Sequence, residues 1–383
     1  MRSLLVLVAA ACLDFWIGDP WGWLHPVQVM GMVIDRYRQW AFAWSPSARL
    51  MRIVGVGLTV VLVLGTALVS ALLLEVLNLL LPVLSGGVEV ILLASCFAGR
   101  SLRQAADDVL TALEPASMSD ESGHKSGHTD EFSYAEDSAG AVLTQARERL
   151  SLYVGRDTAK LSAEEIRRAV LETVSENAID GVLAPLFYAL LGSAFVVNFL
   201  TDGDLTSGDL VGSFLTGGDL AGSDFGGGLS LAVPTALAYK AASTLDSMVG
   251  YRDAPYAELG WCSARFEDML TWLPCRLSVL TIALLSGNPG QVLATCWRDA
   301  RADPSPNAGW SECAYAAALG IQLGGPNTYR GKLKVKPTLG DPTRPITDLV
   351  IAEALAITRR CFLIGLTLGC LLLMVLLFPA ALC

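Results

Sequence analysis

Residues 53–74 read IVGVGLTVVLVLGTALVSALLL, and this stretch contains no charged residue. About 20 consecutive apolar residues in an α-helix are enough to cross the roughly 30 Å hydrocarbon core of a bilayer. The stretch therefore predicts a membrane-spanning helix, and it determines how the rest of the chain is interpreted.

Other apolar stretches indicate further membrane helices. Residues 361–378 (CFLIGLTLGCLLLMVLLF) are the second strong candidate. The run that follows Glu75 reaches Phe97 despite Pro82 and Gly86–Gly87, and it predicts a helix that continues to Arg100 and Arg103. Weaker stretches contain Pro, Gly or charge, as in helices that line a polar cavity; they are residues 182–200, 229–249 and 270–286. We interpret the N-terminal segment as a retained short membrane helix rather than a signal peptide.

The composition supports the same class. Of 383 residues, 53% are hydrophobic and only 17% are charged, whereas a soluble domain has about 25% charged residues. We therefore expect an all-α, polytopic integral membrane protein, a single membrane domain over residues 1–383 with polar cytoplasmic loops and helices. The net charge of −10 and the absence of a basic stripe exclude a nucleic-acid partner. The nine cysteines are scattered without a CxxC pair, so we expect neither disulfides nor a zinc site.

Two segments interrupt this pattern. Residues 114–140 are acidic and poor in apolar residues, which predicts a disordered loop. Residues 198–229 are rich in Gly and Asp, which indicates a loop insertion. Lys and Arg cluster elsewhere, and the positive-inside rule places these clusters on the cytoplasmic side; they lie at 100–103, 147–168, 298–301, 330–344 and 359–360.

Candidate chemistry begins with polar groups next to the apolar segments. Asp14, Asp19 and His25 follow the N-terminal helix; a helix end with a tight Gly-Asp-Pro turn is the structural alternative. Ser162 and Glu165 form a capping box that predicts a helix start.

That helix carries three carboxylates, Glu172, Glu176 and Asp180, with a spacing of four residues that places them on one face. Asn177 lies beside them. Like charges at this spacing destabilise a helix, so the stripe suggests a bound cation such as Mg²⁺; a solvated face is the alternative.

Two more constellations follow. Lys240 would share a helix face with the hydroxyls of Ser243, Thr244 and Ser247, whereas Asp246 points elsewhere. With Arg252 alongside, this face suggests an anion-binding surface, although a lysine at the end of an apolar run also snorkels to the interface. Asn307 and Asn327 lie in Gly/Pro/Asn-rich stretches that we interpret as turns in a loop region. The second of these stretches lacks the Ser/Thr of a P-loop.

In this order the constellations resemble the CobD/CbiB family of adenosylcobinamide-phosphate synthases. The matching stretches are LD…GDP…HPV from residue 13, GRDT at 155–158, ETVSENAIDGVLAPLF at 172–187, KAASTLDSMVGY at 240–251, SPNAGW at 305–310 and LGGP at 323–326. They span nearly the whole chain, and the segments 114–140 and 198–229 depart from the family pattern.

The resemblance implies a multi-pass ligase of the cell (inner) membrane. It would join the free propionate carboxylate of adenosylcobyric acid to aminopropanol or its O-phosphate, using ATP and Mg²⁺, and an acyl phosphate is our expected intermediate. The lipid bilayer and other corrinoid-assembly enzymes are the further expected partners.

The resemblance also suggests roles for individual residues. Glu172, Glu176 and Asp180 would bind the metal ion, with Asp14 or Asp19 as further ligands. Phosphate oxygens would be bound by Arg156, Lys240 and Arg252, and substrate by Asn177, Asp246, Asn307 and Asn327. His25 would accept a proton from the amine, since its usual pKa lies near working pH. Glu176, Arg156, Lys240 and His25 are the predicted catalytic residues.

Two alternatives from other classes stay open. A transporter of a corrinoid precursor would suit polar residues in broken helices, although the sequence shows no inverted repeat and its polar motifs lie at the borders of apolar segments. A non-catalytic scaffold would leave the stripe of three carboxylates without a purpose.

Overall fold

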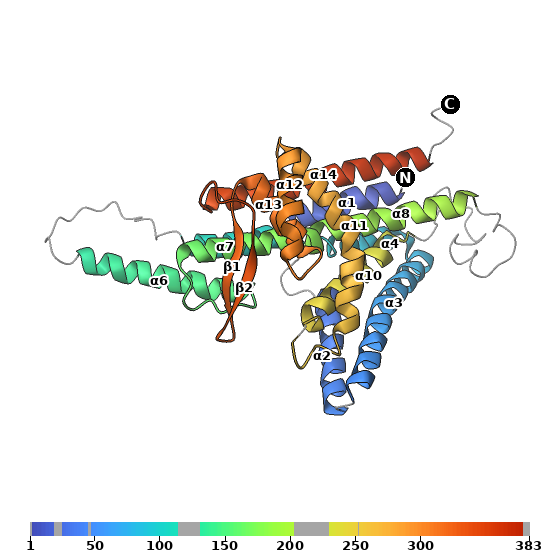
Figure 1. Cartoon of the computed structure of the whole chain (residues 1–383). Coiled ribbons are helices and arrows are strands. Elements are labelled where there is room, and N and C mark those ends of the chain that lie inside the picture. Colours follow the sequence, from blue (N-terminus) through green and yellow to red (C-terminus); the bar gives the residue numbers. More distant parts are fainter. Residues whose placement is uncertain are drawn as a thin grey trace. The chain divides into compact units, whose positions relative to one another are not determined.

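The computed structural model describes residues 2–18, 25–44, 47–113, 131–202, 230–251 and 253–377. Over these ranges the chain is mainly helical, with a single two-stranded antiparallel sheet (Figure 1). The predicted all-α membrane class is confirmed. The chain folds into two compact units, each built from separate stretches of sequence. We call the first, Met1–Arg100, Ile179–Cys275 and Arg360–Cys383, the membrane unit, and the second, Ser101–Ala178 and Arg276–Arg359, the polar unit.

All secondary-structure elements among the described residues of the membrane unit are helices. Its elements are α1 (Arg2–Trp16), α2 (Pro26–Trp44), α3 (Ala48–Leu80), α4 (Pro82–Ala94), most of the π-helix η1 (Ala178–Leu183), α8 (Ala184–Asp202), α10 (Ala232–Val249), the first part of α11 (Trp261–Leu285) and the last part of α14 (Asp348–Leu377). The helix predicted from residues 53–74 is the centre of α3.

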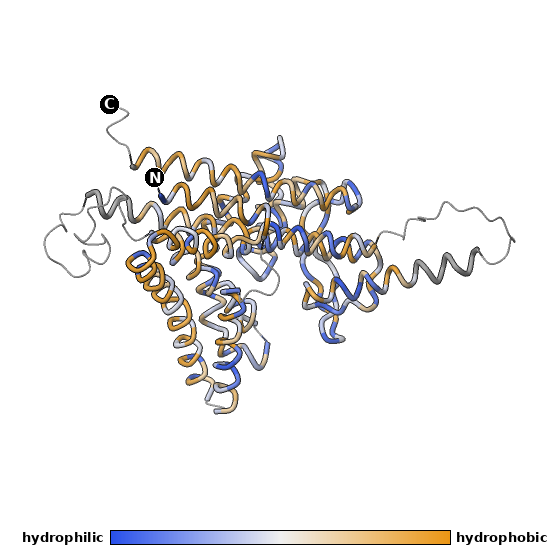
Figure 2. Tube along the Cα trace, turned by 180° about the vertical axis from the view of Figure 1, so that it is seen from behind, coloured by the Kyte–Doolittle hydropathy of each residue, from blue (hydrophilic) through white to orange (hydrophobic). Residues whose placement is uncertain are grey.

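Several described helices are long and apolar enough to cross a bilayer. There are four such spans, or five if a pair bent by 43° counts as one; the four are Ala48–Leu80, Ala163–Phe195, Trp261–Leu285 and Asp348–Leu376. The bent pair is α4 with α5 (Gly99–Thr111). Figure 2 shows α3 and the C-terminal part of α14 as predominantly hydrophobic tubes. A multi-pass membrane protein follows from these spans.

The boundary between α3 and α4 differs from the sequence prediction. We expected a single helix from Glu75 onward that tolerated both Pro82 and the two glycines. Instead α3 continues to Leu80 and the chain breaks at Leu81, whose φ of −142° and ψ of 63° are not helical. A residue before proline is sterically disfavoured in the α conformation, so Pro82 ends one helix and begins the next, whereas Gly86–Gly87 stay inside α4.

Helix α10 packs at the centre of the membrane unit, against α2, α3 and α8. The contact with α8 is close: a Cβ added at Gly192 would lie 2.3 Å from Thr235 Oγ1 and 2.4 Å from Leu231 O. Small residues permit such backbone approach between membrane helices. Glycine at position 192 therefore sets the distance between α8 and α10.

The polar unit combines helices with the hairpin. Its elements are most of α5, α6 (Glu131–Ser151), α7 (Ala163–Asn177), the second part of α11, α12 (Pro289–Asp299), the 3-10 helix η2 (Ala300–Ala302), α13 (Ala308–Leu319), β1 (Leu323–Tyr329), β2 (Lys332–Leu339) and the first part of α14. Helix α13 packs against α7, α12 and both strands. The Lys/Arg clusters at 147–168, 298–301 and 330–344 all belong to this unit.

Three local predictions need correction. The stretch 323–332 is not loop alone, because β1 and β2 form a hairpin over most of it. The predicted loop 114–140 ends earlier, since α6 begins at Glu131; its residues 114–130 lie outside the described part of the chain. The insertion predicted from residue 198 starts later, because α8 continues through apolar residues to Asp202, and residues 203–229 are likewise outside the described ranges.

Candidate active site

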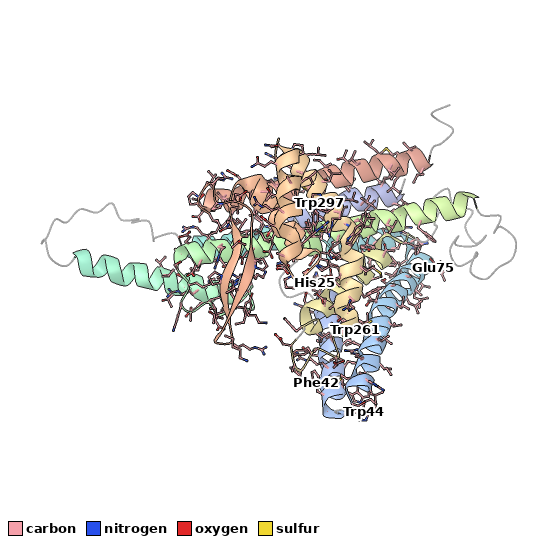
Figure 3. All side chains as sticks on the ribbon, viewed as in Figure 1. His25, Phe42, Trp44, Glu75, Trp261 and Trp297 are labelled. Atoms are coloured by element: carbon pink, nitrogen blue, oxygen red, sulfur yellow. The ribbon has the colours of Figure 1, made fainter. Side chains whose placement is uncertain are left out.

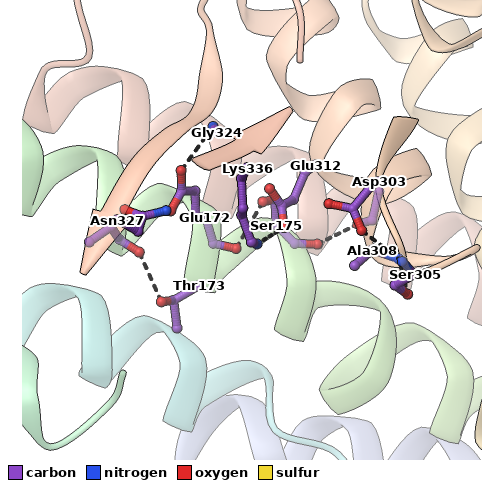
Figure 4. A network of polar contacts seen from close by, with 12 residues as sticks. Glu172, Thr173, Ser175, Asp303, Ser305, Ala308, Glu312, Gly324, Asn327 and Lys336 are labelled. Carbon is purple, nitrogen blue, oxygen red and sulfur yellow. Dashed lines mark hydrogen bonds and ion pairs between the residues drawn. The ribbon is translucent and has the colours of Figure 1, made fainter. Parts of the chain in front are cut away.

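The candidate site is a polar cluster inside the polar unit, built on α7, α13 and the hairpin (Figure 4). Helix α7 starts where the sequence predicted. Ser162 N donates to Glu165 Oε2 at 2.8 Å and Glu165 N donates to Ser162 Oγ at 3.2 Å, which confirms the capping box. This start fixes the phase of the helix, so that Glu172 is buried at 1% exposure and faces β1.

Both carboxylate oxygens of Glu172 are engaged. Oε2 accepts from Arg156 Nη2 in a short ion pair, and Oε1 accepts from the backbone N of Gly324 at 2.9 Å. Arg156 also donates from Nη1 to Asn327 Oδ1 at 2.8 Å. Because the Arg156 and Glu172 side chains are 7% and 2% exposed, this is a buried ion pair that ties α7 to β1.

Arg168, one turn before Glu172, extends the attachment to β1. Its Nη1 donates to Gly324 O at 2.5 Å and its Nη2 donates to Pro326 O at 3.1 Å. The backbone there needs glycine: Gly324 has φ 83° and a Cβ would lie 2.0 Å from Pro337 O. The left-handed conformation and the close strand contact together exclude other residues at this position.

A second ion pair joins β2 to α13. Lys336 Nζ lies 3.2 Å from Glu312 Oε1; the Glu312 side chain is fully buried, and the Lys336 side chain is 29% exposed. Burial raises the pKa of Glu312 to about 8, because the counteracting charge of Lys336 is partly offset by the nearby carboxylates of Glu176, Glu172 and Asp303. Burial alone would lower the pKa of Lys336. The negative charges of Glu312, Glu176, Glu172 and Asp303, of which Glu312 has the largest effect, outweigh burial, so the pKa of Lys336 is raised.

Glu176 and Asp303 complete the cluster. Glu176 lies one turn after Glu172 on α7; the residue as a whole is exposed, but its carboxyl group is buried and interacts electrostatically with Lys336, Asp303, Glu172 and Arg156. Asp303 Oδ1 accepts from Ser305 N at 2.8 Å. The cluster thus places the Glu176 carboxyl group and a partly exposed ammonium beside a buried ionic framework.

Three polar atoms of this framework are buried without a hydrogen-bond partner among the described residues: Glu312 Oε2, Asn327 Nδ2 and Arg168 Nε. Asn327 is 3% exposed and Glu312 is fully buried. Most buried polar groups in folded proteins have a partner. One acceptor and two donors are therefore available here to a water molecule or a ligand.

The structure brings together four predicted residues: Arg156, Glu172, Glu176 and Asn327. Two other predicted residues belong to the polar unit but make different contacts. Asn177 Nδ2 donates to Thr173 O at 2.9 Å at the end of α7. Asn307 accepts from Arg276 Nη1 at 3.4 Å, and Arg276 also lies over the Trp310 ring. Their predicted contacts with substrate stay predictions.

The remaining predicted residues belong to the membrane unit or lie outside the described ranges. Those in the membrane unit are Asp14, His25, Asp180, Lys240 and Asp246; those outside are Asp19 and Arg252. Among the described residues no group of three or more His, Cys, Asp or Glu side chains is arranged to hold a metal ion. The predicted metal role of the five carboxylates stays a prediction.

His25 has a clear local role. It lies at the N-terminal end of α2 (Figure 3), where its Nδ1 accepts from Val27 N at 3.2 Å and its own N donates to Gln28 Oε1 at 3.3 Å. This reciprocal pattern is that of a capping box. His25 thus stabilises the start of α2, and its predicted function as a base stays a prediction.

The sequence reasoning missed Lys336, Glu312, Asp303 and Arg168. Glu312 carried a signal, because it is the one charged residue in the apolar stretch AGWSECAYAAAL. Lys336 carried a weaker one, as part of the alternating basic pattern KLKVK. Neither signal indicated that the two side chains would meet.

Comparison with known proteins gives a consistent result. A family model described as "CobD/Cbib protein" matches residues 7–358. "Cobalamin biosynthesis protein CobD" of Synechocystis sp. is 42% identical over 367 residues, covering 96% of this chain and 91% of the relative. "Cobalamin biosynthesis protein CbiB" of Salmonella typhimurium is 35% identical over 380 residues, covering 95% and 99%. No solved structure is significantly similar.

Proposed function

Because the chain belongs to the CobD/CbiB family of cobalamin biosynthesis proteins, we propose that it is the ligase that joins adenosylcobyric acid to an amino alcohol. The new bond would be an amide between the free propionate carboxylate and the amine of aminopropanol or its O-phosphate. The enzyme would act in the cell (inner) membrane, with the Lys/Arg clusters of the polar unit on the cytoplasmic side. The observation that carries the proposal is the polar cluster on α7, α13 and the hairpin.

The reaction proceeds in two balanced steps. A propionate oxygen attacks the γ-phosphorus of ATP, which forms an acyl phosphate and releases ADP. The amine, after losing a proton, attacks the acyl carbon, and inorganic phosphate leaves with the electron pair of the broken C–O bond. The first step is needed because a carboxylate is a poor electrophile.

Both steps concentrate negative charge on phosphate oxygens. Lys336 is suited to stabilise it, because its ammonium is partly exposed and the surrounding carboxylates keep it protonated. Preorganised charges of this kind lower the barrier without reorganising during the reaction. Arg156 is less accessible and acts as a positioning residue, since it holds Glu172 and Asn327 in place.

The cluster fits a Mg²⁺ ion delivered with a nucleotide better than a resident metal. Mg²⁺ is usually bound through one or two carboxylates together with substrate phosphates and waters. Glu176 is the carboxylate that fits, because it lies within the cluster beside Lys336, and Asp303 is the second. When bound, Mg²⁺ would neutralise charge on the phosphoryl oxygens.

The test is a reaction on purified, detergent-solubilised protein. Adenosylcobyric acid, Mg-ATP and either aminopropanol or its O-phosphate are supplied, and corrinoid products are followed by mass. The expected result is a new amide, whose mass increment identifies the acceptor, together with one ADP per product. No product with either acceptor from folded protein, combined with corrinoid uptake into sealed vesicles, would establish the transporter instead.

A further inference from the structure

The membrane unit brings the beginnings of two candidate spans, α3 and α11, together. Arg52, near the start of α3, forms an ion pair with Glu258, which lies in the segment before α11. That segment lies directly on α3, because a Cβ added at Gly55 would be only 2.1 Å from Leu259 O. Trp261, the first residue of α11 (Figure 3), is therefore held at the level where α3 begins.

The Trp261 ring has two guanidinium groups beside it. Arg52 Cζ lies 5.6 Å and Arg265 Cζ lies 5.4 Å from the ring centroid. Glu258 neutralises Arg52 through Nε and Nη2, but Nη1 of Arg52 donates to no described residue. Arg265 is exposed and forms no ion pair with a described residue, not even with Asp268 three residues later. One positive charge of this group is therefore not neutralised by a described carboxylate.

An exposed apolar stripe continues along α11 from this group. Met269, Trp272 and Leu273 are 64%, 52% and 45% exposed. They follow Arg265 by four, seven and eight residues, and this spacing places them on the same face of the helix. Because α11 is long and apolar enough to cross a bilayer, the acyl chains of lipids would cover this stripe.

The same order of residues occurs on α3. Arg49 is exposed and forms no ion pair with a described residue. Ile53, Val56 and Val60 follow it by four, seven and eleven residues and are 65%, 39% and 48% exposed. Both spans therefore begin with an exposed cation and continue with an apolar face, which is the order of headgroup and acyl chain in a phospholipid.

We propose that Trp261, Arg52 and Arg265 bind the headgroup of an anionic phospholipid, whose acyl chain lies along Met269 and Leu273. Guanidinium groups donate well to phosphate oxygens, and tryptophan is enriched at the level of the headgroups. The charge of Arg265 favours an anionic lipid over a zwitterionic one. Pairing of two copies through this face is disfavoured, because it would bring Arg265 of both copies together. The proposal does not depend on the ligase activity.

The test is a lipid titration of the full chain in detergent, with bound lipid counted by native mass spectrometry. Phosphatidylglycerol and phosphatidylcholine are the two probes. Arg265→Gln removes the cation without an ion pair, and Glu258→Gln removes the carboxylate that neutralises Arg52. The matched control is Arg301→Gln, because Arg301 Cζ also lies over a tryptophan ring, 4.4 Å from the centroid of Trp297, but in the polar unit.

The expected result is tighter binding of phosphatidylglycerol than of phosphatidylcholine. Arg265→Gln should weaken phosphatidylglycerol binding about fivefold and Glu258→Gln should strengthen it by a similar factor, since the two substitutions change the local charge by one unit in opposite directions. Arg301→Gln should leave binding unchanged.

Three results would overturn the proposal. The first is equal affinity for the two lipids. The second is weaker binding in both Arg265→Gln and Glu258→Gln, or an equal loss in Arg301→Gln, because neither pattern is that of a charge-selective site at Trp261. The third is a dimer that forms in place of the lipid complex, which would show that a second copy covers this face.

Discussion

Replacing Glu172 by Gln is expected to destabilise the polar unit strongly. The substitution removes the negative charge from a pair whose side chains are 7% and 2% exposed, and it leaves the Arg156 guanidinium buried without its counterion. Breaking a buried pair in this way costs about 3–5 kcal/mol. The lower end applies here, because the amide oxygen of Gln can still accept from Gly324 N.

A loss of about 3 kcal/mol corresponds to roughly 6–12 °C in melting temperature for a domain of 150–250 residues. Buried cysteines of the polar unit can report its melting temperature without any added label site. Cys296 and Cys313 of the polar unit are fully buried, so a thiol-reactive fluorophore will label them only when the unit unfolds.

The matched control is Glu164→Gln, the same substitution at an exposed position in the first turn of the same helix. Its melting temperature should equal that of the unmodified protein. The double variant Arg156→Gln/Glu172→Gln should lose less stability than the two single variants added together, because the pair is coupled. A melting temperature for Glu172→Gln within about 2 °C of the unmodified protein would refute the buried pair.

Three further outcomes follow from the site. Glu176→Gln should abolish amide formation, as followed by product mass, while keeping the fold; an active variant would remove Glu176 from the proposed metal site. Burial raises the pKa of Glu312 to about 8, so the folded state binds more protons than the unfolded state above the ordinary Glu pKa of about 4.3. Stability should therefore fall as pH rises from about 5 to 8 and then level off, and Glu312→Gln should flatten this profile in melting experiments between pH 5 and 9. Asp157→Ala should speed hydrogen exchange at residues 328–333 while leaving α7 protected, because it removes the two hydrogen bonds to the hairpin turn. Unchanged exchange would show that the turn is stable without these hydrogen bonds.

Local signals in the sequence predicted structure well. The uncharged run at 53–74 became the centre of α3, and Ser162 with Glu165 marked the start of α7. Both depend on residues within a few positions of each other, where spacing alone determines which side chains meet. The hairpin was missed because its local signals are weak. Its start, Gly324-Gly325-Pro326, has low strand propensity, and its turn is Arg-Gly rather than Asn-Gly.

The site was only partly predictable because its contacts are distant in sequence. Glu172 was predicted as a metal ligand from its spacing along a helix, but the structure shows that both its oxygens face Arg156 and Gly324. Spacing within a helix does not reveal what packs against its face. Lys336 and Glu312 meet only because β2 packs beside α13, which no local pattern encodes.

Because the polar unit is built from two separate stretches of chain, it can be completed only late in translation. Glu172 and Arg156 are synthesised early, but Gly324, the backbone partner of Glu172, follows 152 residues later. At typical elongation rates of about 5–20 residues per second, roughly 8–30 s pass between the synthesis of Glu172 on α7 and the synthesis of Gly324 in the hairpin that covers it. During that time the nascent chain also inserts α8, α10 and the start of α11. The polar unit is therefore completed late in synthesis, and any truncation before residue 339 releases a chain that lacks the complete hairpin.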